Sequence, residues 1–138
     1  MSDSGLKKRV FGWMMFDWAS QPYNTLLLTF IFGPYFASAV MDDPVQAQSM
    51  WGFAIGASGF VIAVLAPILG AFADTSGRKM PWIWLFSGLY VLGSAALWLA
   101  VPGMDDVTFI LLLFCLGLIG MEFATIFTNA MLSTLGDR

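Results

Sequence analysis

The chain has 138 residues, of which 59% are hydrophobic and 11% charged, and its formal net charge is −3. Soluble domains are about 45–50% apolar and about 25% charged, so this composition excludes an ordinary soluble domain and indicates an integral multi-pass membrane protein. With one Cys and no His, an internal disulfide and the usual zinc and haem ligand sets are excluded. We therefore expect no metal, no cofactor and no nucleic-acid partner.

Four apolar stretches are long enough to cross a bilayer, whose core of ~30 Å takes about 20 helical residues. We predict an all-α membrane protein with four transmembrane helices at about residues 18–40, 50–72, 81–101 and 107–132. The short hinges between them contain strong turn signals, such as Asp43-Pro44 and Pro102-Gly103.

The basic residues all fall on one side of this topology. They are Lys7, Lys8, Arg9, Arg78, Lys79 and Arg138. The two opposite loops carry Asp residues and no Lys or Arg. The positive-inside rule then predicts that both termini are cytoplasmic, most simply in the cell (inner) membrane.

The first predicted span carries polar residues at helical spacing. Asp17, Ser20, Gln21 and Asn24 follow the i, i+3, i+4, i+7 pattern of one helix face. Lipid cannot satisfy such groups, so we expect this face to turn toward protein or a water-filled cavity. Asp17 could equally be a solvated boundary residue, and Asn24 could hydrogen-bond either a substrate or a neighbouring helix. The basic residues before the first apolar run resemble the start of a signal peptide. Because Asp17 lies between the basic residues and the apolar run, we expect that this segment is not cleaved and remains as the first span.

The second predicted span carries a stripe of small residues at steps of three and four. Its members are Gly52, Gly56, Gly59, Ala63, Ala66 and Gly70. Such a stripe is typical of a packing face that lets another helix approach closely.

The hinge at residues 70–79, GAFADTSGRK, interrupts the apolar sequence with several charges. Asp74 follows the C-terminal end of the second span, where the helix dipole already presents partial negative charge. A carboxylate there needs a positive partner, which Arg78 or the N-terminus of another helix could supply. Gly77 gives the chain the freedom to turn back.

The third and fourth predicted spans differ in polarity. The third has few polar side chains and several tryptophans, so we expect a peripheral helix that faces lipid. The fourth carries Glu122, Thr125, Asn129 and Ser133 at helical spacing. Glu122 lies about ten residues, or ~15 Å of helix, from the cytoplasmic end; it could take up and release a proton, or stay protonated and hydrogen-bond a neighbouring helix. Asn129 could bind a substrate or, equally, Asn24.

The hinge closely resembles the loop between the second and third helices of the major facilitator superfamily, written G-x-L-A-D-R-x-G-R-[RK]. The matching positions are Gly70, Ala73, Asp74, Gly77, Arg78 and Lys79. Phe72 stands where Leu is usual, and Thr75 stands where the first Arg is usual.

Residues 16–36, FDWASQPYNTLLLTFIFGPYF, are similar to the first helix of the unknown major facilitator family, which is related to the vacuolar amino-acid effluxers of fungi. Asp17, Trp18, Ala19 and Tyr23 match its D-W-A-x-x-x-[YF] pattern. The resemblance implies a secondary active transporter of a small solute, amino acids among the possibilities, which works by alternating access and is driven by a gradient of protons or of another ion, with proton coupling as the preferred interpretation. Helices one and four would line the path, with Asp17, Gln21, Asn24, Glu122 and Asn129 on it.

Family members usually have twelve spans in two halves, so residues 1–138 would correspond to helices 1–4 and form part of an N-terminal half. We expect an incomplete chain whose partners are the missing C-terminal helices, the lipid bilayer, a small-molecule solute and protons. Two alternatives stay open: a small four-helix multidrug exporter acting as a dimer, and a non-transporting membrane assembly module. An enzyme is not expected, because the protease-like GASG at residues 56–59 has no His to act as base.

Overall fold

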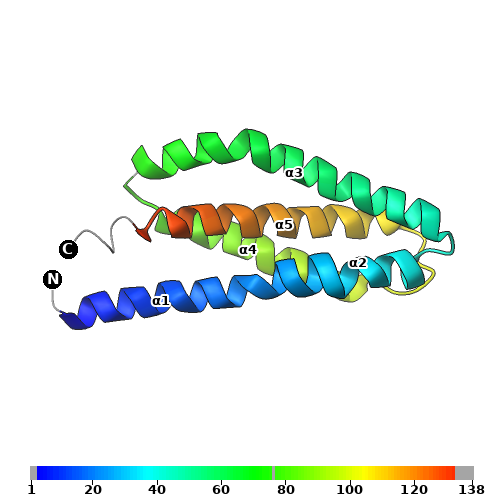
Figure 1. The fold of residues 1–138 in the computed structure, drawn as a ribbon, viewed down its shortest axis with the longest axis horizontal. Coiled ribbons are helices and arrows are strands. Elements are labelled where there is room, and N and C mark those ends of the chain that lie inside the picture. Colours follow the sequence, from blue (N-terminus) through cyan, green and yellow to red (C-terminus); the bar gives the residue numbers. More distant parts are fainter. Residues whose placement is uncertain (1–2, 76, 133–138) are drawn as a thin grey trace.

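The computed structural model describes residues 3–75 and 77–132, and over these ranges every regular element is a helix. Within these ranges, four helical segments are long and apolar enough to cross a membrane, as predicted (Figure 1). They span Gly5–Val40, Pro44–Thr75, Met80–Leu99 and Val107–Asn129. The first helix begins and the last helix ends at the same end of the bundle (Figure 1). Ser133 and Arg138 lie outside the described residues.

The first segment is a succession of helix types rather than one regular helix. It consists of α1 (Asp3–Pro22), the π-helix η1 (Tyr23–Phe30), α2 (Phe32–Tyr35) and the π-helix η2 (Phe36–Val40). Helix α1 begins well before the predicted start at residue 18, because hydropathy marks where a helix becomes apolar and not where it begins. Proline lacks the N–H of a helical hydrogen bond, and the first wide turn follows directly after Pro22.

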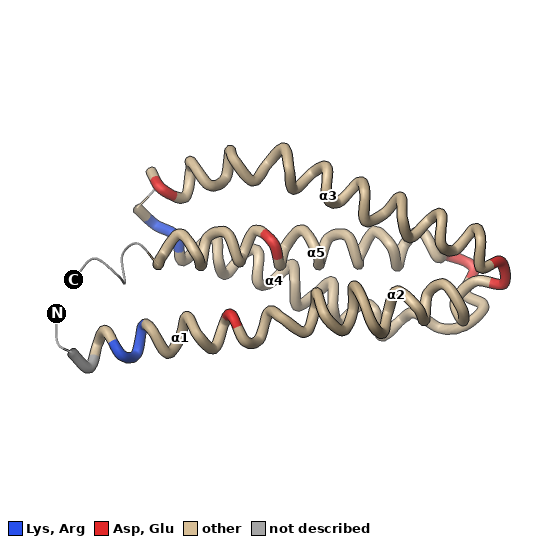
Figure 2. Tube along the Cα trace, in the orientation of Figure 1, with Lys and Arg blue, Asp and Glu red and all other residues tan. Residues whose placement is uncertain are grey.

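The other three segments are more regular. They are α3 (Pro44–Thr75), α4 (Met80–Ala96), which continues into the 3-10 turn η3 (Leu97–Leu99), and α5 (Val107–Asn129). Charged residues lie mainly at the two ends of the bundle, with Lys and Arg at the end where α1 begins and Asp in the loops at the opposite end (Figure 2). The side of the membrane on which each end lies stays a prediction.

At the end of the bundle opposite the basic residues, aspartates in the loops accept hydrogen bonds at the starts of α3 and α5. A carboxylate oxygen of Asp43 accepts hydrogen bonds from the backbone N–H groups of Val45 (2.9 Å) and Gln46 (3.3 Å) at the start of α3. A carboxylate oxygen of Asp106 accepts one from the N–H of Phe109 (3.1 Å) and caps α5. Both carboxylates also lie at the positive ends of helix dipoles.

Replacing Asp106 with alanine is therefore expected to lower the free energy of unfolding by about 1 kcal/mol, the usual loss for an N-cap. Equilibrium unfolding in mixed micelles measures this change. Asp105→Ala is the matched control, because Asp105 is an exposed acid in the same loop but not the cap residue. An equal loss in both variants would show that loop charge, and not capping, is responsible.

Helices α4 and α5 cross at glycines. A Cβ atom added to Gly93 would lie 2.5 Å from the Cα of Gly117, and one added to Gly120 would lie 2.9 Å from the carbonyl oxygen of Phe86. The backbones therefore meet with no side chain between them, a form of packing common in membrane helices. The outer side of α4 is exposed, with Trp84 73% accessible, and Trp98 of η3 is 89% accessible. This exposure is as expected for a lipid-facing helix, but the close packing of the inner side of α4 was not predicted.

Within the described residues, the small-residue stripe of α3 is not the face that packs against the other helices. Gly52, Gly56, Gly59 and Gly70 would place an added Cβ in open space, and Ala63 is exposed. Only Ala66 contacts a core cluster, at its edge. Helix α3 instead turns Ala47, Ala54 and Ser58 inward, where the aromatic residues of the first and fourth segments fill the space. Packing of the stripe against a further helix stays a prediction.

Two aromatic clusters form the core. In the first, Phe114 of α5 lies between Tyr23 (ring centroids 5.6 Å apart), Phe32 (5.6 Å) and Trp51 (4.6 Å). In the second, nearer the basic end, Phe127 of α5 stacks on Trp82 at 5.9 Å and on Phe86 at 5.8 Å. The apolar stretch of α5 is 50% buried, against 28% or less for the other three segments, so α5 is the central helix of the described fold.

Candidate functional site

The first π-helix is fixed to α5 by one buried tyrosine. The hydroxyl of Tyr23, a residue only 1% exposed, donates a hydrogen bond of 2.7 Å to the backbone carbonyl of Phe114. Gly117 makes room for it, since an added Cβ there would lie 2.5 Å from the hydroxyl oxygen. The ring of Tyr90 meets that of Tyr23 edge-on, at 5.3 Å. Helices α4 and α5 thus hold the point where the first segment changes from α to π geometry.

Asn24, the residue after Tyr23, brings the predicted polar face of the first segment against Met121 of α5. The amide nitrogen of Asn24 lies 3.8 Å from the sulfur of Met121, and the hydroxyl of Thr125 lies 3.8 Å from the same sulfur. Thr125 also donates to the backbone carbonyl of Met121, at 2.9 Å. A thioether sulfur is a weak acceptor, so the Asn24 amide keeps most of its capacity to bind another group. π-Helical turns are frequent at functional sites, and this one places Asn24 against α5.

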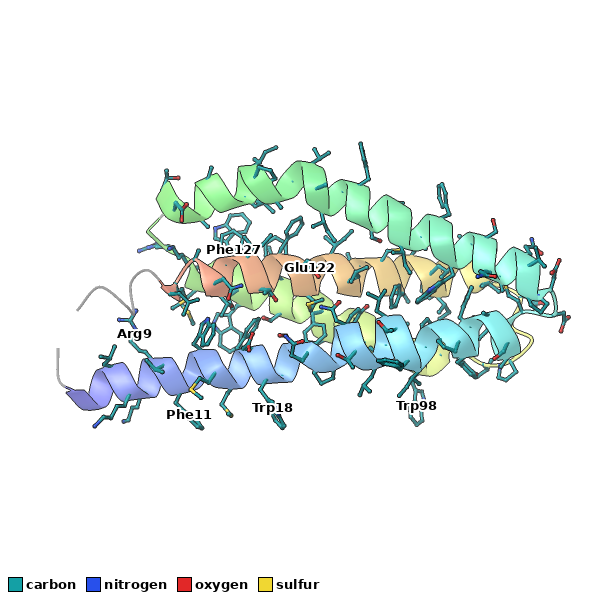
Figure 3. All side chains as sticks on the ribbon, in the orientation of Figure 1. Arg9, Phe11, Trp18, Trp98, Glu122 and Phe127 are labelled. Carbon is teal, nitrogen blue, oxygen red and sulfur yellow. The ribbon has the colours of Figure 1, made fainter. Side chains whose placement is uncertain are left out.

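The other predicted site residues differ in exposure. Asp17 and Glu122 are half-buried, whereas Gln21 and Asn129 are exposed. Figure 3 shows Glu122 on α5 away from both ends of the helix. Among the predicted path residues in the part of the chain that the structure describes, Asn24 has a side-chain contact that joins the first segment to α5, and its partner is Met121. The roles of all five residues stay predictions.

The charged hinge between α3 and α4 turns at Gly77, as predicted from the sequence. Gly77 has a φ of 61°, in the left-handed region that favours glycine. Asp74 and Arg78 are both exposed. An ion pair between them stays a prediction. Lys79 instead donates a hydrogen bond of 2.6 Å from its ammonium group to the carbonyl of Ala130, directly after α5. A cation stabilises the negative end of a helix, so this hinge also holds the end of α5.

Several residues of this region were not predicted. The sequence pattern gives no structural role to Tyr23 and does not predict the contacts of Met121 and Lys79. Gly117 and Gly120 on α5, spaced i and i+3, are the signal that could have indicated the α4–α5 crossing. The contact of Lys79 with Ala130 joins residues far apart in the sequence and has no local signal.

A partly open cavity of about 390 Å³ lies between α3 and α5, toward the acidic loops. Its walls are mostly apolar, with Ser49, Thr108 and Cys115 as the polar exceptions. None of the predicted path residues lines this cavity. Over the described ranges, no group of three or more His, Cys, Asp or Glu side chains is placed to hold a metal ion.

No protein-family model matches the chain, and no solved structure matches it. It is 30% identical over 128 residues to a Bacillus subtilis (strain 168) protein named "Uncharacterized MFS-type transporter YxiO", where MFS stands for major facilitator superfamily. The matched region covers 91% of this chain and 29% of the relative, so the chain spans less than a third of the relative's length.

Proposed function

We propose that this chain supplies the first four helices of a secondary active transporter of the major facilitator superfamily. The similarity to an MFS-type transporter over 91% of the chain carries this proposal, and with the four apolar helices it supports a membrane transporter of that superfamily. The finer assignment, to the unknown major facilitator family, rests on the resemblance of residues 16–36. The complete carrier would move a small solute, such as an amino acid, by alternating access.

In this proposal the polar faces of the first and fourth helices line the path of the solute. The contact of Asn24 with Met121 supports it, because it holds Asn24 against α5, beside Thr125 of the fourth helix, through an acceptor too weak to occupy the amide fully. Asp17, Gln21 and Asn129 would line the same path toward the basic end. A half-buried carboxyl on an otherwise apolar helix is functional by default, so Glu122 is the proposed site of proton uptake and release.

The proposal also assigns partners to surfaces that this chain leaves open. The small-residue stripe of α3 would pack against helices of the missing C-terminal part, and the outer side of α4 would face lipid. The carrier would lie in the cell (inner) membrane with the basic end of the bundle in the cytoplasm, because positive charge collects on that side. Asp74 and Arg78 of the exposed hinge would then lie at the cytoplasmic face, where the two halves of a carrier close.

Expression of the complete reading frame that contains this chain tests the proposal. We expect inside-out vesicles holding the product to release protons from an imposed gradient when a mixture of amino acids is added, and vesicles holding residues 1–138 alone to show no response. A pH-sensitive dye measures the release. Proton-linked efflux by the 138-residue chain alone would favour the dimeric exporter, and no response from either product would favour the assembly module.

A further inference from the structure

A second cavity, of about 460 Å³, opens at the basic end of the bundle between α1, α4 and the end of α5. Much of its wall is apolar, formed by Phe16 of α1, Ile83 of α4 and Met131 after α5. Its size is within the range of small-molecule sites. None of its lining residues is acidic, and it is separate from the contact between Asn24 and Met121.

Two polar atoms at this cavity are buried without a hydrogen-bond partner. They are the indole nitrogen of Trp13 and the hydroxyl of Thr128, and Thr128 is only 5% exposed. Burying a polar group without a partner is unfavourable, and the large majority of buried side-chain polar atoms in proteins have one. Both residues line the cavity, so a bound molecule that accepts hydrogen bonds would satisfy them.

The positive charge of Arg9 indicates which kind of hydrogen-bond acceptor the cavity would bind. Arg9 also lines it, and in Figure 3 Arg9 extends from α1 toward the other helices, whereas Phe11 on the same helix points away. A guanidinium group, an indole N–H and a hydroxyl are all donors, and a guanidinium binds phosphate well. The polar part of the ligand is therefore an anionic group, and the apolar walls accept a hydrocarbon part.

We propose that this cavity binds an anionic phospholipid from the leaflet at the basic end of the bundle. The phosphate contacts Arg9, Trp13 and Thr128, and the upper part of one acyl chain lies against Phe16 and Ile83. Basic pockets between transmembrane helices are known to take acidic lipid headgroups. This site does not depend on the transport function proposed above.

Native mass spectrometry of the full 138-residue chain, exchanged in mild detergent with equal amounts of phosphatidylglycerol and phosphatidylcholine, tests the site. We expect phosphatidylglycerol to be retained at least tenfold over phosphatidylcholine. Arg9→Gln should abolish this preference, and Lys8→Gln, which removes the same charge from an exposed neighbour that does not line the cavity, should keep it. Equal losses in the two variants would show attraction by surface charge and overturn the proposal.

Two further variants distinguish loss of the lipid site from misfolding of the chain. Thr128→Val removes the unpartnered hydroxyl; it should raise the melting temperature of the lipid-free chain and lower retention of phosphatidylglycerol. Gly12→Leu should block binding by filling the cavity, because an added Cβ at Gly12 meets no atom within 4 Å. Full retention in Gly12→Leu, or equal binding of soluble glycerol 3-phosphate and the lipid, would contradict a site that holds an acyl chain.

Discussion

Replacing Gly93 with leucine is expected to separate α4 from α5 and to lower the free energy of unfolding by roughly 3 kcal/mol, the upper end of the usual overpacking range. Even a single Cβ at Gly93 would lie 2.5 Å from the Cα and 2.7 Å from the nitrogen of Gly117. Both contacts are to backbone, so no flexible side chain can move aside. Equilibrium unfolding in mixed micelles, or loss of folded protein on a sizing column, measures the change.

Gly88 on the same helix provides the control. A Cβ added there meets nothing within 4 Å, and the residue is exposed. Gly88→Leu should therefore leave stability nearly unchanged, apart from the small gain in helix propensity of leucine over glycine. If Gly93→Leu and Gly88→Leu unfold alike, the backbones of α4 and α5 do not meet as described.

Replacing Glu122 with glutamine in the complete carrier is expected to abolish accumulation of solute against its gradient while exchange of solute continues. Glutamine has the shape of a protonated glutamate but cannot release a proton. A carrier that has lost its coupling ion can still cycle between its two states, but it can only equalise concentrations. Uptake driven by an imposed pH gradient, measured beside solute exchange in the same vesicles, separates these two activities.

Asp105→Asn makes the same acid-to-amide change in an exposed loop outside the path, and it should leave both activities intact. Glu122→Asp, which keeps a carboxyl, should retain part of the coupled uptake. Full coupled uptake by Glu122→Gln would remove Glu122 from the proton pathway and leave it a structural role.

The positions of the four helices followed from hydropathy, because a membrane imposes both length and apolarity on any helix that crosses it. The spacing of polar residues also predicts that Asn24 turns away from lipid, and in the structure its amide contacts Met121 of α5; its role on a solute path stays a prediction. It did not predict the π-helical turns after Pro22, since proline only removes a hydrogen bond and the packing of Tyr23 decides what geometry replaces it.

The choice of packing faces could not be read from the sequence. Small residues allow close approach on any helix, so the stripe of α3 and the glycines of α4 and α5 carry the same local signal. Among the glycines that the structure describes, those at the α4–α5 crossing meet, whereas an added Cβ on the α3 glycines Gly52, Gly56, Gly59 and Gly70 would contact nothing. Lys79 and Ala130 likewise come together only once α4 and α5 have paired.

The most direct test of the account is whether the two polar faces are reached by water. In the complete carrier with Cys115→Ala, single cysteines at Gln21, Asn24 and Glu122 would be treated with a membrane-impermeant maleimide, beside cysteines at Trp84 and Val91 on the outer side of α4. The account predicts that the first three positions react and the last two do not. Protection of Asn24 and Glu122 equal to that of Trp84 would place both residues in hydrocarbon and contradict a path between the first and fourth helices.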